Sequence, residues 1–295
     1  MNGTKDQVKT LFSGRAAEWA AWYADRDVRT LETDNLVSRQ QRAIEMLQAR
    51  TPPPARVLDV GCATGEMAGR LLERGYDVRG VDIAEPMVRR ARERWGANRF
   101  EVGDGERLPF DECAFDAVVC LGVIEYQEAD GRTLAEIHRV LTHGGRAVIS
   151  TPSAISPLYH LDRAALALEA AIKPVYYSVK YRLRGRAIPA DRPAAGVAIR
   201  RYRRGEWLGR LRAAGLQPEE FVCRGWGWYR SRLGGAASFL SRQGRHLRRG
   251  VDALAGPDRR ARATEGFVRH PALNWIGAEQ IVRVRAIKAS QPRGR

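Results

Sequence analysis

Two acidic residues flank the part of the chain whose residue types are best suited to hold a ligand. The segment DVGCATG, residues 59–65, follows the apolar run ARVLDV, and the next apolar run, GVDIA, carries Asp82. Gly61 and Gly65 allow backbone to approach a ligand closely, and a carboxylate at the tip of the following strand can accept hydrogen bonds from both hydroxyls of a ribose. The pattern therefore predicts a ligand that carries a ribose.

A strand, a turn and a helix are needed to position these residues. ARVLDV has the apolar, β-branched density of a buried parallel strand, and EMAGRLLERG after the turn has a helical pattern. Helical patterns such as EPMVRRARERW and DGRTLAEIHRVL separate the other expected strands. The first five strands are expected near 55–60, 76–82, 98–102, 115–121 and 145–151. Such alternation predicts a parallel sheet that binds ligands at the carboxyl ends of its strands.

Glycine spacing decides between cofactor classes. A dinucleotide site needs G-x-G-x-x-G with a helix N-terminus aimed at pyrophosphate. Gly61, Ala63 and Gly65 do not fit this spacing, and Gly69 lies a full turn too late. The segment instead resembles motif I of the class I S-adenosylmethionine-dependent methyltransferases, D-x-G-x-G-x-G, with Ala63 in place of the middle glycine.

The resemblance extends over about a hundred residues and keeps the family's motif order. Asp82 matches the family's ribose-binding acid, and GDGERLPF at 103–110 resembles its G-D-A-x-x-L-P-F segment, in which Asp104 would accept from the adenine amino group. FDAVVCLGVIEY and HRVLTHGGRAVISTP resemble the fourth and fifth strand signatures. The resemblance implies an α/β fold with a doubly wound, seven-stranded, mostly parallel, Rossmann-like sheet, and S-adenosylmethionine as cofactor. The residues expected to bind the cofactor in the core are Asp59, Gly61, Gly65, Asp82, Ile83, Asp104, Gly105 and Leu121.

The first 50 residues look helical and are interpreted as an N-terminal cap. Phe12, Trp19, Trp22 and Tyr23 lie on this segment. In relatives such a helix lies over the cofactor, so Trp22 and Tyr23 are expected at the cofactor site, where an aromatic ring can cover the sulfonium by a cation–π contact. Ordinary packing of the aromatic residues on the core is the alternative.

Methyl transfer leaves few marks in a sequence, because the protein mainly has to align acceptor, methyl group and sulfur. A general base is needed only if the acceptor is a hydroxyl that must lose its proton. Tyr126 and His160 are the candidate catalytic residues. Tyr126 stands where quinone-pathway relatives often have histidine, and His138 is expected on a helix behind the sheet in a structural role.

The expected domain organisation is a cap at 1–50, a cofactor-binding core at 51–152 and a remainder of the same domain at 153–295. That remainder contains a late helix near 200–214 and two further strands, Leu216 to Val222 and a last one near 278–288. Two helical insertions, 153–195 and 226–262, are expected to recognise the acceptor.

Charge divides the chain into two halves. Residues 1–150 hold 21 basic and 24 acidic side chains, a net of −3, whereas residues 151–295 hold 29 and 10, a net of +19. The basic half suggests an anionic partner such as a membrane surface, and arginine-rich solvated faces are the alternative. The four cysteines form no C-x-x-C pair, so no metal site is expected, and no apolar run reaches the length of a bilayer span. These features predict a cytoplasmic protein with peripheral contact to the inner face of the membrane.

Three functional classes follow from these observations. The leading prediction is a methyltransferase for a small molecule, on a hydroxyl of a lipid-linked, quinone-like or secondary-metabolite acceptor. A nucleic-acid methyltransferase would suit the basic half, but the sequence has no N-P-P-Y-type tetrad for a flipped base. A binding module without catalysis is the third class, against which the acids Asp59, Asp82 and Asp104 argue. The oligomeric state cannot be predicted.

Overall fold

A computed structural model describes residues 4–17, 19, 31–156, 160, 199–224 and 279–288. These residues build one seven-stranded sheet in the order β3-β2-β1-β4-β5-β7-β6. β7 pairs antiparallel with β5 and β6, and the other pairs are parallel. The strands are β1 (Arg56–Val60), β2 (Asp77–Asp82), β3 (Phe100–Val102), β4 (Phe115–Leu121), β5 (Leu141–Pro152), β6 (Leu216–Arg224) and β7 (Glu279–Ala286).

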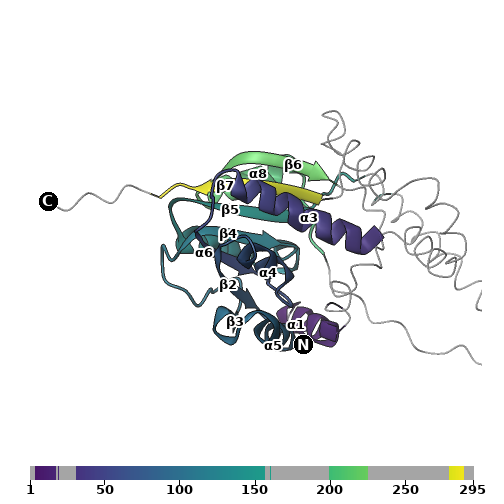
Figure 1. Cartoon of the computed structure of the whole chain (residues 1–295). Coiled ribbons are helices and arrows are strands. Elements are labelled where there is room, and N and C mark those ends of the chain that lie inside the picture. The colour runs from purple at the N-terminus through teal and green to yellow at the C-terminus, as the bar shows by residue number, and fades with distance from the viewer. Residues whose placement is uncertain are drawn as a thin grey trace, which may run out of the picture.

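Helices cover both faces of the sheet (Figure 1). One face packs against α3, α4 and α5, and the other packs against α6 and α8. The helices are α1 (Thr4–Gly14), α3 (Leu31–Gln48), α4 (Glu66–Leu72), α5 (Glu85–Trp95), α6 (Asp130–Val140) and α8 (Arg204–Ala213), with short 3₁₀ turns η1 (Ala97–Arg99) and η2 (Ile124–Tyr126). The expected fold class, a doubly wound, seven-stranded, mostly parallel sheet, is confirmed.

Burial on both faces explains why the strands read as continuous apolar runs. On β1, Val57 packs in the cluster that contains α3, α4 and α5, whereas Leu58 and Val60 pack in the cluster that contains α6 and α8. The side chains alternate between the two layers, as strand geometry requires.

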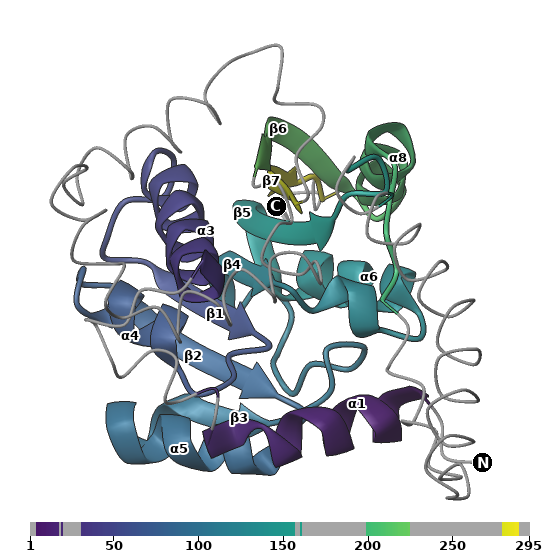
Figure 2. The same ribbon diagram turned by 90° about the vertical axis from the view of Figure 1, so that its right-hand side faces the viewer.

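The strand order places a crevice beside β1. β2 and β3 follow on one side of β1, while β4 and β5 follow on the other, so the connections leave the carboxyl end of β1 in opposite directions. A crevice at such a switch point is where open α/β sheets bind ligands. Figure 2 shows α1 beside α5 near the carboxyl ends of β2 and β3, which places the N-terminal helix over this edge.

Several predicted features lie outside the described residues. These are Trp22, Tyr23, the insertion at 226–262 and most of the insertion at 153–195, of which only residues 153–156 and 160 are described. The domain bounds at 50 and 152 therefore remain predictions. Over the described ranges, no helix is both long and apolar enough to cross a membrane.

Candidate cofactor and acceptor site

An open cavity lies where the carboxyl ends of β1 to β4 meet helices α1 and α3. Its empty space, including the mouth that is open to solvent, is about 830 Å³. Six of the residues predicted to bind the cofactor line it: Gly61, Asp82, Ile83, Asp104, Gly105 and Leu121. The sequence therefore predicted correctly which strand ends would converge.

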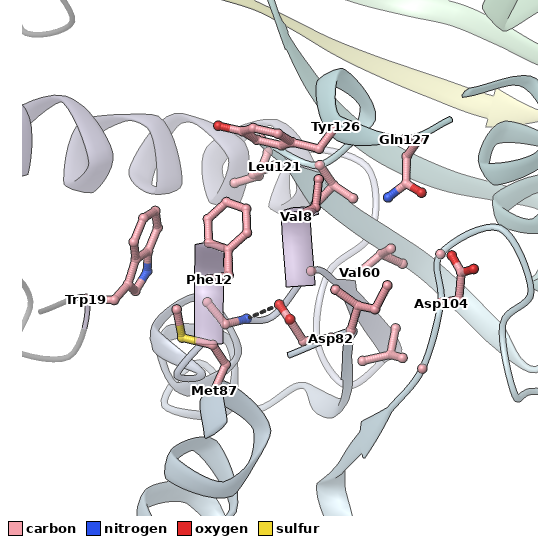
Figure 3. A pocket seen from close by; sticks show the side chains of 18 of the residues that line it. Val8, Phe12, Trp19, Val60, Asp82, Met87, Asp104, Leu121, Tyr126 and Gln127 are labelled. Carbon is pink, nitrogen blue, oxygen red and sulfur yellow. Dashed lines mark hydrogen bonds between the residues drawn. The ribbon is translucent and has the colours of Figure 1, made fainter. Parts of the chain in front are cut away.

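The turn after β1 is held in its shape by the acid at the end of β2. Gly61, Ala63 and Gly65 all have positive φ angles, of 73°, 47° and 84°. The Asp82 carboxylate accepts hydrogen bonds from the backbone N–H groups of Ala63, at 3.0 Å, and Ala84, at 2.9 Å. The first of these bonds is drawn in Figure 3. Because left-handed backbone is costly for alanine, the bond to Ala63 compensates part of that strain.

Position 61 requires glycine for two reasons: its φ angle is positive, and there is no space for a side chain. A Cβ at this position would lie 2.2 Å from Cγ2 of Val123, which follows β4. The backbone of Gly61 is instead hydrogen-bonded to the Val81 carbonyl at 2.8 Å. The turn is thereby packed between the ends of β2 and β4.

The Asp82 carboxylate can still accept a hydrogen bond from a ligand in the cavity. Burial raises the pKa of its carboxyl group, and the backbone hydrogen bonds of Ala84, Ala63 and Ile83 oppose that rise. A carboxylate has about four lone-pair sites, so these bonds leave room for a hydroxyl donor from a ligand.

Asp104 is paired with a lysine that the sequence did not single out. Lys5 Nζ of α1 lies 2.5 Å from Asp104 Oδ2 and 2.9 Å from Glu106 Oε2. Burial lowers the pKa of Lys5, but the hydrogen bonds to both acids outweigh that effect and raise it. Lys5, Val8 and Phe12 share one face of α1, and Val8 and Phe12 line the cavity. The ion pairs of Lys5 thus fasten the helix that covers the site.

Asp59 and Gly65 lie behind the turn rather than at the cavity wall. Asp59 shares the Val57 side of β1, is 3% exposed and accepts a hydrogen bond from the backbone of Ala68 in α4. Burial, followed by the charges of Asp82 and Glu66, raises the pKa of Asp59 to about 7. At Gly65 a Cβ would lie 2.7 Å from Cδ1 of Trp95. Both residues support the turn from the side of the helices.

Three aromatic rings form one side of the cavity. Phe12 packs edge-to-face on Tyr126, with ring centroids 5.3 Å apart, and on Trp19, with centroids 5.9 Å apart. Figure 3 shows Phe12 between these two rings, with Trp19 on the opposite side of the cavity from Asp104. Phe12 and Trp19 of the N-terminal segment thus reach the cavity, whereas Trp22 and Tyr23, which were expected at the cofactor site, lie outside the described residues.

The two predicted catalytic residues occupy different places. Tyr126 lines the cavity, whereas His160 is exposed, does not line it and has its Nε2 atom 3.0 Å from the Ala154 carbonyl. His138 lies on α6 with Nε2 3.1 Å from the Ile287 carbonyl, in the structural role expected for it. Within the described part of the chain, no three His, Cys, Asp or Glu residues could hold a metal ion.

Arg39 is a charged residue of the cavity wall that was not predicted from the sequence. It lies on α3 and contacts the cavity, and its Nη1 atom donates to Glu279 Oε1 at 2.9 Å. The two residues are 240 positions apart, and nothing in their flanking sequence marks them as a pair. Only the folded sheet, which places β7 beside β5, brings them together.

The strand order, the glycine-rich turn after β1 and the acid at the end of β2 together define the Rossmann-like fold of the class I S-adenosylmethionine-dependent methyltransferases. Residues 58–149 match the sequence profile of the family described as "Methyltransferase domain". Residues 58–149 therefore form a methyltransferase domain, and they are similar to the class I methyltransferases, for which S-adenosylmethionine is the cofactor.

Curated relatives match part of the chain. A demethylmenaquinone methyltransferase of Deinococcus radiodurans is 40% identical over 119 residues, which cover 38% of this chain and 49% of the relative. A malonyl-[acyl-carrier protein] O-methyltransferase of Geobacter sulfurreducens is 34% identical over 144 residues, which cover 47% and 50%. The chain thus spans about half the length of the curated relatives it matches.

Solved structures share the fold at low sequence identity. The [4+2]-cyclase SpnF superposes with a TM-score of 0.58 at 18% identity, over 97% of this chain and 98% of that one. Magnesium protoporphyrin IX methyltransferase from Synechocystis PCC 6803 has a TM-score of 0.55 at 16% identity, over 95% and 98%. Since one of these proteins is a cyclase, the fold alone does not determine the reaction.

Proposed function

We propose that this protein transfers the methyl group of S-adenosylmethionine to a small-molecule acceptor. The observation that carries the proposal is the cavity at the ends of β1 to β4, in which two carboxylates on neighbouring strand ends face a shared space. Asp104 follows β3 and Asp82 ends β2. Asp104 is placed to accept a hydrogen bond from an adenine amino group, and Asp82 is placed to accept hydrogen bonds from the hydroxyls of a ribose.

The rest of the cofactor then extends toward β4 and the aromatic wall. Phe12, Trp19 and Tyr126 border this part of the cavity. A sulfonium next to aromatic rings is stabilised by a cation–π attraction, which favours the positively charged methyl donor over its neutral product.

The reaction is an in-line displacement. A lone pair of the acceptor forms a bond to the methyl carbon while the carbon–sulfur bond breaks, and its electron pair stays on sulfur as S-adenosylhomocysteine forms. The acceptor proton leaves to a base or to water. We assign the contact with the acceptor to Tyr126, because it lines the cavity whereas His160 does not. Alignment of the reacting atoms supplies most of the rate enhancement.

For the acceptor we propose a hydroxyl of a lipid-linked, quinone-like or secondary-metabolite molecule. The names of two relatives, a demethylmenaquinone methyltransferase and a malonyl-[acyl-carrier protein] O-methyltransferase, support acceptors that are small or carried on another molecule. The apolar residues Val8, Leu36 and Trp19 on the cavity wall suit an apolar acceptor body.

Two measurements test the proposal. Calorimetry should show binding of S-adenosylhomocysteine and no binding of NADH. Incubation of a metabolite extract with methyl-labelled S-adenosylmethionine, followed by mass spectrometry, should reveal a labelled product that is absent with the Asp82→Ala variant. Tight NADH binding would contradict the cofactor class. Cofactor binding with no labelled product in any extract would favour a non-methylating activity, as the cyclase fold relative illustrates.

A further inference from the structure

The four cysteines of the chain differ in what can reach them. Cys62, Cys120 and Cys223 are buried, whereas Cys113 is exposed. Burial raises the pKa of the Cys62 and Cys120 thiols, which keeps them protonated and unreactive. Of these four thiols, the one that a dissolved oxidant can reach in the folded protein is that of Cys113.

Cys113 lies beside an amine. Lys288 Nζ is 3.1 Å from Cys113 Sγ, although the two residues are 175 positions apart in the chain. The lysine side chain is 12% exposed, so its ammonium group is largely removed from water. Glu112 Oε1 lies further away, at 3.5 Å, on a side chain that is 68% exposed. The sulfur is thus closer to the ammonium than the neighbouring carboxylate is.

A shared backbone acceptor holds the two groups together. The carbonyl of Arg139, in the last turn of α6, accepts the Cys113 N–H at 3.0 Å and Lys288 Nζ at 2.8 Å. Cys113 has a φ of 58°, a left-handed conformation that is uncommon for a residue with a side chain. Because the turn at Cys113 and the ammonium of Lys288 bind the same oxygen, the thiol and the amine are kept side by side.

The pair lies at the edge of the sheet opposite the cavity. Cys113 comes just before β4, and Lys288 comes just after β7, which runs antiparallel to β5. The start of β4 and the end of β7 are both at the amino-terminal edge of the parallel strands, whereas the cavity is at their carboxyl ends. A bond between the two side chains would therefore join β7 to the centre of the sheet without entering the cavity.

We propose that Cys113 and Lys288 form an oxidation site, at which hydrogen peroxide links the sulfur to the lysine nitrogen. In the first step the thiolate attacks a peroxide oxygen, the O–O bond breaks, and the leaving hydroxide takes a proton from the Lys288 ammonium to become water. The sulfur is oxidised by two electrons to a sulfenic acid, and the peroxide is reduced.

The second step uses the amine that the first step has freed. The Lys288 nitrogen attacks the sulfenic sulfur, an S–N bond forms, the S–O bond breaks, and the departing hydroxide takes a proton from nitrogen to become water. Sulfenic acids condense in this way with backbone nitrogen, and an amine is the stronger nucleophile. One thiol, one amine and one hydrogen peroxide thus give a sulfenamide and two waters. This site does not depend on the proposed methyl transfer.

The test treats the full chain with hydrogen peroxide and maps the products by peptide mass spectrometry without reductant. The expected product is a cross-link between the peptides of Cys113 and Lys288, lighter than the two peptides together by two hydrogen atoms and reversed by dithiothreitol. Cys62, Cys120 and Cys223 should remain unmodified. In guanidinium chloride the cross-link should be lost, because the unfolded chain does not hold the two side chains together.

Two variants of the lysine separate its charge from its nucleophilic amine. Lys288→Arg keeps a cation beside Cys113, but a guanidinium stays protonated, so dimedone should trap a sulfenic acid at Cys113 and no cross-link should form. Lys288→Met removes the cation as well and should slow the oxidation of Cys113 several-fold. Cys113→Ser is the control without the thiol.

Thermal unfolding gives a second measurement. The cross-link closes a long loop and reduces the entropy of the unfolded chain, so the unfolding midpoint of the peroxide-treated parent should rise by several degrees and return after dithiothreitol. Cys113→Ser should show no such rise. The proposal is overturned if Cys113 is not oxidised, if its oxidation in the parent stops at the sulfenic acid, or if a disulfide between two chains is the main product. A cross-link that forms equally well in guanidinium chloride would also overturn it, and none of these results bears on methyl transfer.

Discussion

The Asp82 carboxylate holds the turn after β1 and also faces the cavity. Its bonds to Ala63 and Ala84 join the end of β2 to the turn that a ligand must approach. Sequence spacing predicted the acid and the glycines, because motif residues lie close together along the chain. It could not predict that Ala63 would be fastened by Asp82, since that bond depends on the left-handed backbone at position 63.

Replacement of Asp82 tests this residue directly. Asp82→Ala removes the acceptor of the ribose hydroxyls and should weaken S-adenosylhomocysteine binding by about 2 to 4 kcal/mol, measured by calorimetry. Asp77→Ala is the matched control, because Asp77 is the acid at the other, exposed end of the same strand. Equal affinity of Asp82→Ala and the parent would contradict the assignment.

Asp59 gives a pH dependence of stability. Its pKa is about 7 in the folded protein, against an ordinary value of 3.8, so the folded state binds more protons than the unfolded state between these values. The free energy of unfolding should therefore fall as pH rises from about 4 to 7 and level off above 7, by at most about 1.4 kcal/mol per pH unit. Asp59→Asn does not titrate and should lose this slope in chemical denaturation at several pH values. A parallel slope in both proteins would argue against the raised pKa.

At the scale of elements, α1 is the part of the site that the sequence described least well. The sequence predicted a helix over the cofactor, with Trp22 and Tyr23 at the site. Those two residues lie outside the described ranges, whereas Phe12 and Trp19 line the cavity. The Lys5 attachment to Asp104 and Glu106 was not predictable, because the partners are about a hundred positions apart and the orientation of α1 decides which acid Lys5 meets. Arg39 and Glu279 were missed for the same reason.

The ion pairs of Lys5 predict that the hold of α1 over the cavity weakens as the salt concentration rises. Its ion pairs are partly exposed, so each contributes about 1 kcal/mol or less and is screened by salt. Lys5→Met should speed the release of S-adenosylhomocysteine several-fold at low salt and abolish the salt dependence of that rate, measured by stopped-flow fluorescence. Lys9→Met, at an exposed position of the same helix, is the control. An unchanged release rate in Lys5→Met would show that α1 does not limit release.

At the scale of the whole molecule, the charge contrast between the two halves of the chain was visible in the sequence, and the alternation of strand and helix patterns predicted a parallel sheet. The apolar runs at 56–60 and 115–121 predicted strands buried on both faces, and both are central strands of the sheet. The strands that pair antiparallel, β6 and β7, were expected near their observed positions. Which sheet neighbours they would have follows from the family resemblance, since periodicity alone carries no pairing information.

The basic half predicts an electrostatic contact with membranes. We propose that the insertions at 153–195 and 226–262 dock the site on an anionic surface, supported by the net charge of +19 in residues 151–295. Each basic residue near such a surface contributes about 1 kcal/mol, and salt weakens that attraction. Co-sedimentation with phosphatidylglycerol vesicles should occur at low salt and decrease at high salt. Equal sedimentation with neutral phosphatidylcholine vesicles, or none at low salt, would favour a freely diffusing acceptor.

The position of β7 has a consequence for how the protein is made. β7 is the last of the seven strands to leave the ribosome, yet it lies between β5 and β6 and carries Glu279, the partner of Arg39. In a nascent chain that has exposed only the first six strands, the edges of β5 and β6 that will pair with β7 are therefore open, and Arg39 lacks the carboxylate of Glu279. Since non-local strand pairing is slow and open edges favour aggregation, the growing chain is most exposed to misassembly just before its final strand emerges.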